Sequence, residues 1–127
     1  MYSCIEHMAI AAKDTAALAR WYQDRLGFTV AYDNKKDPPT IFVRLGEGSL
    51  LEIIPASQEP RRERKTSDPG MSHFAISVQD FEAVQADLTA KGIEVRDIRE
   101  ASRGVKVGFF EDPEGNLVQV IYRPEPL

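Results

Sequence analysis

Two histidines, one glutamate and one glutamine are the residues of this chain whose types and spacing suit metal binding. His7 precedes Glu52 by 45 residues, and His73 precedes Gln119 by 46 residues. Two imidazoles and two oxygen donors match the preferences of Zn, Ni, Co, Mn or Fe(II). The four residues therefore indicate a site for one divalent metal ion.

The same four residues occupy equivalent positions in an internal repeat. Residues 7–14, His-Met-Ala-Ile-Ala-Ala-Lys-Asp, match residues 73–80, His-Phe-Ala-Ile-Ser-Val-Gln-Asp, at four positions. Residues 48–54 match residues 115–121 at three positions, and Glu52 falls on Gln119. Two matches in the same order and at nearly the same separation indicate a duplicated unit.

Each repeat predicts a strand, a helix and three further strands. Asp14 and Asp80 suit helix N-caps, because a carboxylate can accept hydrogen bonds from the first turn, and Gly27 and Gly92 suit helix ends. We therefore expect an α+β fold of two tandem βαβββ modules with a curled mixed sheet. The expected ranges within a single domain of residues 1–127 are about 1–54 for module 1, 55–70 for the linker and about 71–127 for module 2. The expected strands are 5–11, 28–32, 40–45 and 49–54, then 71–78, 94–98, 105–110 and 116–122.

Strand alternation predicts where the polar side chains point. Phe74, Ile76 and Val78 share one face, which should cover the helix, so His73 lies on the other face. Glu52 and Gln119 also alternate with apolar residues, and the four side chains converge if the two sheets curl together. A lone strand His is usually a hydrogen-bonded core or surface residue. Burying an unpaired carboxylate such as Glu52 costs several kcal/mol, however, and a metal ion removes that cost. A former metal cup that now binds an organic molecule is the alternative.

The motifs resemble the vicinal oxygen chelate superfamily, which includes glyoxalase I, methylmalonyl-CoA epimerase, extradiol dioxygenases and fosfomycin- and bleomycin-resistance proteins. The resemblance covers nearly the whole chain. It implies a homodimer, and metal ligands from the first and last strands of each module, which are His7, Glu52, His73 and Gln119. The last-strand position is usually Glu in this superfamily, and Gln119 departs from that pattern. The residues that carry the resemblance are Ile5–His7, Trp21–Phe28, Leu51–Glu52, Ser72–Val78 and Glu111–Gln119.

Three functions follow from this resemblance. The first is a glyoxalase I-like, metal-dependent lyase or isomerase that stabilises an enediolate of a small oxygen-chelating substrate, with Glu52 as the catalytic base. The second is an extradiol-type dioxygenase, because two His and one carboxylate also suit Fe(II). The third is a non-catalytic small-molecule binder like the bleomycin-resistance proteins. Arg44, Arg103 and Lys106 lie near predicted strand ends and are candidates to contact a substrate carboxylate.

Composition excludes several other classes of function. The net charge of −4 argues against a nucleic-acid partner, which requires a concentrated basic face. No apolar run approaches the roughly 20 residues of a membrane span. A single cysteine fits a reducing compartment, so a cytoplasmic location is expected.

Overall fold

In the computed structural model, which describes residues 1–127, the first helix has the ends that the sequence predicts. The side chain of Asp14 accepts a hydrogen bond of 2.8 Å from the backbone N–H of Ala17 and caps α1 (Thr15–Leu26). Gly27 ends the helix with φ at 76°, a left-handed conformation in which a Cβ atom is strained. Its backbone N–H donates to the carbonyl of Gln23, so the last turn of the helix is satisfied.

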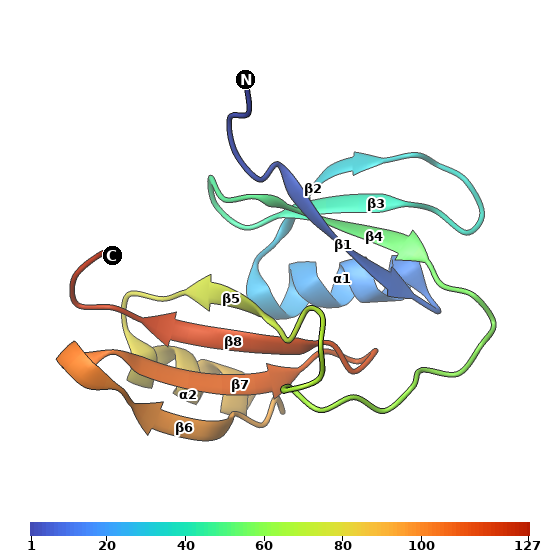
Figure 1. The fold of residues 1–127 in the computed structure, drawn as a ribbon. Helices are drawn as coiled ribbons and strands as arrows, with labels where there is room; N and C mark the ends of the chain where they lie inside the picture. Colours follow the sequence, from blue (N-terminus) through green and yellow to red (C-terminus); the bar gives the residue numbers. More distant parts are fainter. The chain divides into compact units, whose positions relative to one another are not determined.

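The first sheet has four strands in the order β1-β4-β3-β2. Strands β1 and β4 are parallel, and the other two pairs are antiparallel. Helix α1 covers one face of this sheet (Figure 1), and the buried side chains of Val43, Leu51 and Ile53 belong to that covered face. The opposite face of the sheet, called here the open face, carries the polar residues. The strands are β1 (His7–Ala12), β2 (Thr29–Asp33), β3 (Ile41–Arg44) and β4 (Leu50–Pro55).

The second sheet repeats this topology in the order β5-β8-β7-β6. Helix α2 (Phe81–Ala90) covers one face, and its N-cap Asp80 accepts from the backbone N–H of Ala83 at 2.9 Å. Phe110, Val118 and Val120 are buried against the helix. The strands are β5 (Phe74–Ser77), β6 (Arg96–Glu100), β7 (Lys106–Glu111) and β8 (Leu117–Tyr122), with a short 3₁₀ turn η1 (Ser102–Gly104) before β7.

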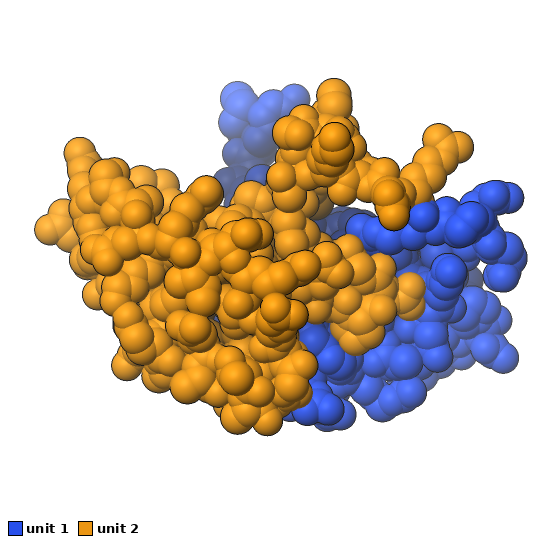
Figure 2. Space-filling model, turned by 90° about the horizontal axis from the view of Figure 1, so that it is seen from below, with its two compact units in different colours: residues 1–61 blue, residues 62–127 orange.

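The chain divides into two compact units, residues 1–61 and 62–127, which Figure 2 colours separately. Each unit contains one complete βαβββ module, so the predicted α+β fold of two tandem modules is confirmed. The predicted linker, residues 55–70, is shared between the units, and its first residue, Pro55, ends β4. The single-domain organisation stays a prediction. No helix combines the length and apolarity that crossing a membrane requires.

Strand β5 begins three residues later than the predicted strand 71–78, and β6 lies two residues later than the predicted strand 94–98. Its pairing with β7 shifts between Arg96 and Arg99, which is a β-bulge, and Asp97 has φ at 51°. Arg96 lies opposite Phe109 and Arg99 lies opposite Val107. The bulge therefore places both arginines on the face of the second sheet that α2 does not cover, which is the open face of this unit. They share this face although Arg99 follows Arg96 by three positions.

Candidate functional site

The first unit brings His7 and Glu52 together on the open face of its sheet. The Nε2 atom of His7 lies 3.3 Å from Oε2 of Glu52. The two side chains keep 41% and 21% of their surface exposed, so both are accessible to a ligand. The parallel register sets Glu52 opposite Ala9, two residues along β1 from His7, and both side chains share one face because strand residues alternate.

A second carboxylate holds the other nitrogen of His7. Glu6, which precedes β1, pairs with Nδ1 of the imidazole. This hydrogen bond raises the pKa of His7 above its ordinary value of 6.5, and the negative charges of Glu6 and Glu52 act in the same direction, whereas desolvation lowers it. A carboxylate on one ring nitrogen fixes the tautomer and leaves the other nitrogen for a metal. Glu6 is therefore placed to orient His7.

The second unit repeats this arrangement with different side chains. The hydroxyl of Ser72, which immediately precedes His73, lies 3.0 Å from Nδ1 of that histidine. Gln119 is 9% exposed and comes from β8, whose open face also carries Leu117. No hydrogen bond joins His73 to Gln119. Each unit therefore contributes one histidine with an occupied Nδ1 and one oxygen-bearing side chain from the last strand.

An aromatic ring from the neighbouring strand packs beside the two polar residues in each unit. The His7 ring meets the ring of Phe42 edge to face at 5.6 Å, and Phe42 lies opposite Glu52 in the β3–β4 pair. In the second unit, His73 meets Phe109 edge to face at 5.2 Å, and Phe109 lies opposite Gln119. The duplication thus extends to the surroundings of the four predicted ligands.

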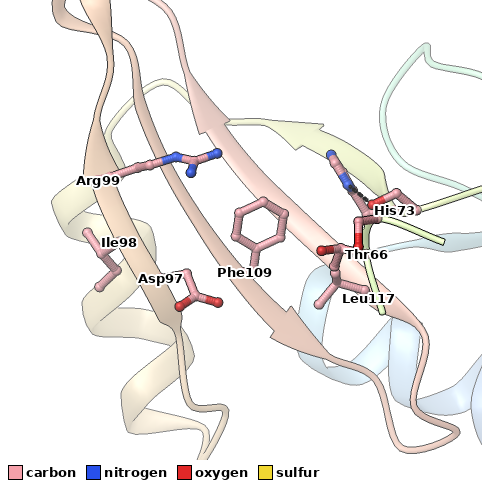
Figure 3. Close-up of a pocket in the computed structure, with 9 residues that line it drawn as sticks. Thr66, His73, Asp97, Ile98, Arg99, Phe109 and Leu117 are labelled. Carbon is pink, nitrogen blue, oxygen red and sulfur yellow. Dashed lines mark hydrogen bonds between the residues drawn. The ribbon is translucent and has the colours of Figure 1, made fainter. Parts of the chain in front are cut away.

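An open cavity of about 630 Å³ lies on the open face of the second unit. Figure 3 shows Phe109 between Arg99, which extends from β6, and His73 on the opposite side. Asp97 also comes from β6, and hydroxyl side chains lie near His73. The residues that line the cavity are Thr66, Ser67, Ser72, His73, Asp97, Ile98, Arg99, Phe109 and Leu117.

The three cations predicted to contact a substrate lie in different places. Arg44 ends β3 opposite Leu50 and shares the open face with Phe42. Arg103 is exposed in η1, where it has φ at 61°. Lys106 forms an ion pair with Glu82 of α2, so it lies on the helix-covered side of the sheet. None of the three lines the cavity of the second unit.

The donor atoms of the first unit fit a metal ion. Two ligands bonded at about 2.0–2.2 Å lie roughly 3.0–3.5 Å apart at octahedral or tetrahedral angles, and the separation of His7 Nε2 from Glu52 Oε2 is 3.3 Å. The pair therefore has the spacing of two ligands on one ion. No three His, Cys, Asp or Glu side chains gather closely enough to hold a metal by themselves.

Comparison with known proteins identifies the family. Residues 4–120 match the model of the Glyoxalase/Bleomycin resistance protein/Dioxygenase superfamily. The chain belongs to this superfamily. A glyoxalase family protein from Enterococcus faecalis is 31% identical, with a TM-score of 0.79 over 94% of this chain and 98% of the other. The resemblance inferred from the sequence motifs is confirmed.

Two solved structures of lower sequence identity share the fold. Lactoylglutathione lyase from Agrobacterium tumefaciens is 22% identical, with a TM-score of 0.73 over 95% of this chain and 94% of the other. TnmS3, an antibiotic binding protein from Streptomyces sp. CB03234, is 18% identical, with a TM-score of 0.76 over 96% and 97%. The fold of this superfamily member therefore occurs in a lyase and in a binding protein.

Proposed function

We propose that this protein is a metal-dependent, glyoxalase I-like lyase or isomerase. The observation that carries the proposal is the 3.3 Å approach of His7 Nε2 to Glu52 Oε2, with Nδ1 of the same ring held by Glu6. The proposed ligands of the metal are His7, Glu52, His73 and Gln119. The units supply these ligands from one chain or from two chains of a homodimer.

The chemistry proposed for this site is proton transfer between adjacent carbons. A divalent cation held by these side chains would polarise a substrate oxygen and so acidify the neighbouring C–H group. Glu52 supplies the base. Its Oε2 atom faces His7, while its Oε1 atom makes no hydrogen bond or ion pair and is available to accept a proton. The same carboxyl group then returns the proton to the next carbon, so the reaction needs no external oxidant or reductant.

Gln119 leaves the site with one carboxylate. Its amide oxygen can coordinate a metal, but the amide cannot act as a base near neutral pH. A single base suffices to move a proton between neighbouring carbons. Epimerisation moves a proton to and from opposite faces of one carbon and requires a second base, which Gln119 does not provide. The proposed substrate is therefore a small molecule with two neighbouring oxygens, such as a hydroxycarbonyl compound.

Metal content and activity test this proposal together. We expect the protein purified without chelator to retain a stoichiometric divalent metal and to convert the methylglyoxal–glutathione hemithioacetal or a related α-hydroxycarbonyl compound. Glu52→Gln should remove proton transfer, measured as loss of solvent deuterium exchange at the substrate carbon. Retained metal with oxygen uptake would identify a dioxygenase instead. Absence of metal affinity would refute the enzymatic proposal.

A non-catalytic binding protein is the second candidate. The aromatic-walled cavity of about 630 Å³ in the second unit favours it, because that volume suits a drug-sized organic molecule. The antibiotic binding protein TnmS3 has the same fold. Ligand binding that persists in the presence of a chelator, without turnover, would support this candidate.

A further inference from the structure

We propose that Arg99 is the anion-recognition residue of the cavity in the second unit and that the ligand carries a carboxylate. Arg99 lines the cavity and has no hydrogen-bond or ion-pair partner. A guanidinium presents a planar set of N–H donors that matches a carboxylate in a bidentate arrangement. The inference deepens the proposed function, since the same open face carries His73, one of the proposed metal ligands.

The other two cations within β6 and β7 are already paired. The guanidinium of Arg96 contacts Oε1 of Glu111 at 2.9 Å. Lys106 pairs with Glu82 on the helix-covered side. Arg99 alone among them points into the cavity and forms no ion pair, because the bulge at Asp97 turns it onto the open face.

The cavity has polar groups at two opposite sides and an apolar floor between them. Arg99 lies on β6 and His73 directly precedes β5, at opposite edges of the sheet order β5-β8-β7-β6, so three strand spacings, or about 14 Å, separate them across the sheet. Phe109 and Leu117 line the space between them. A ligand that reaches both sides therefore carries its carboxylate at one end, its reactive oxygens near His73, and an apolar or aromatic segment in between.

Asp97 makes a carboxylate a better ligand than a phosphate. It lines the same cavity as Arg99, so its negative charge acts on any bound anion. A phosphate dianion feels both the attraction of Arg99 and the repulsion of Asp97 about twice as strongly as a monoanion, and its second charge has no Lys or Arg partner in the cavity lining. The lining thus favours a monoanionic organic acid.

The test uses three probes on the full-length chain: 4-phenylbutyrate, the neutral 4-phenylbutyramide, and 3-phenylpropyl phosphate. Binding is followed by NMR titration, first with chelator and then with added zinc. We expect the carboxylate to bind at least tenfold more tightly than the amide and the phosphate. Arg99→Gln should weaken carboxylate binding about 10- to 100-fold, because it removes hydrogen bonds to a charged group. Amide binding should change less than twofold.

Three further variants define the result. Arg99→Lys keeps the charge but loses the planar fork, and should fall between the wild type and Arg99→Gln. Asp97→Asn should improve binding of the phosphate probe. Arg20→Gln, on the exposed side of α1 in the first unit, removes the same charge from a helix that does not line the cavity and should bind like the wild type.

The outcomes separate this inference from the proposed function. Equal binding of the carboxylate by the wild type and Arg99→Gln would overturn the role of Arg99, even if the protein binds zinc and transfers protons. Equal loss in Arg20→Gln would also overturn it, since that result indicates a general charge effect. Arg99-dependent carboxylate binding in a protein with no zinc affinity would refute the proposed function and leave the anion site intact.

Discussion

Removal of the Glu6 carboxylate should weaken metal binding without removing a ligand. Glu6 pairs with Nδ1 of His7, and Nε2 of the same ring faces Glu52 at 3.3 Å. Partners of this kind hold the tautomer and ring orientation of a metal-binding histidine, and their loss typically lowers metal affinity 10- to 100-fold. Because the Glu6 side chain is 66% exposed, we expect Glu6→Ala to lie near the lower limit, at about tenfold.

The pH dependence of this effect has a definite sign. Glu6 also raises the pKa of His7, so protons compete with the metal for this ring more strongly in the wild type than in the variant. At pH values above the pKa of His7, protons no longer compete with the metal, so only the lost orientation of the ring lowers the metal affinity. The variant should then show its full loss of affinity. As pH falls, the variant loses less affinity than the wild type, since its His7 holds a proton less tightly. The ratio of the two affinities should therefore shrink toward acidic pH.

The assay is a zinc competition titration against a chromophoric chelator at about pH 8 and again at about pH 6. Glu59→Ala is the matched control, since Glu59 is an exposed carboxylate of the same unit. Ser72→Ala removes the equivalent partner of His73, and its neutral hydroxyl should contribute a smaller, severalfold effect. If Glu6→Ala and Glu59→Ala bind zinc equally at both pH values, the orienting role of Glu6 is wrong.

Three further predictions concern the second unit. Gln119→Glu adds a second carboxylate to the proposed site and should tighten zinc binding at least tenfold in the same titration. Glu82→Gln should lower the free energy of unfolding above pH 4.5 and match the wild type in strong acid. The hydrogen bond with Lys106 lowers the pKa of Glu82 below 4.5, so the stabilisation by the carboxylate disappears as the pH falls through that lowered pKa. Urea unfolding midpoints measured against pH test this, and a constant difference at all pH values would contradict it. Gly108→Ala should destabilise the protein by about 1–3 kcal/mol, because the added Cβ atom would lie 2.7 Å from Cγ1 of Val95; an unchanged urea midpoint would refute the crowding.

The duplicated frame could be predicted from the sequence because its signals are local. Asp14 and Asp80 cap helices as expected. The alternation in residues 73–78 correctly assigned the faces of the first strand of module 2, with Phe74 and Ile76 less exposed than their neighbours. These features depend on side chains within a few positions of one another, so no knowledge of distant contacts was needed.

The residues that surround the proposed ligands were harder to predict. Regular alternation places Arg99 on the helix-covered face, and only the bulge at Asp97 reverses this. Glu6 and Ser72 each precede a histidine, and neighbours in a regular strand point to opposite faces. Both lie outside their strands, which begin at His7 and Phe74, and so both can fold back onto the histidine ring.

The adjacent phenylalanines show a similar limit. Phe110 is completely buried against α2, whereas Phe109 lines the cavity. Because the two residues are adjacent in a strand, their side chains must point to opposite faces, but the sequence alone did not establish which of them lines the cavity. The pairing of β7 with β8 decides it, since Phe110 lies opposite the buried Val118.

The bulge in β6 decides which charged side chains face this cavity. Regular pairing of the same sequence would turn either the preceding or the following arginine toward α2, whereas deleting one residue near Asp97 would keep both arginines on the open face, two positions apart. The first unit has its own irregularity at a different place, between Val30 and Tyr32, so its outer strand presents an aromatic ring at the position where the second unit presents Arg96. Gain or loss of a bulge in these outer strands therefore offers evolution, and the protein engineer, a way to exchange the side chains that a ligand contacts while every histidine keeps its place.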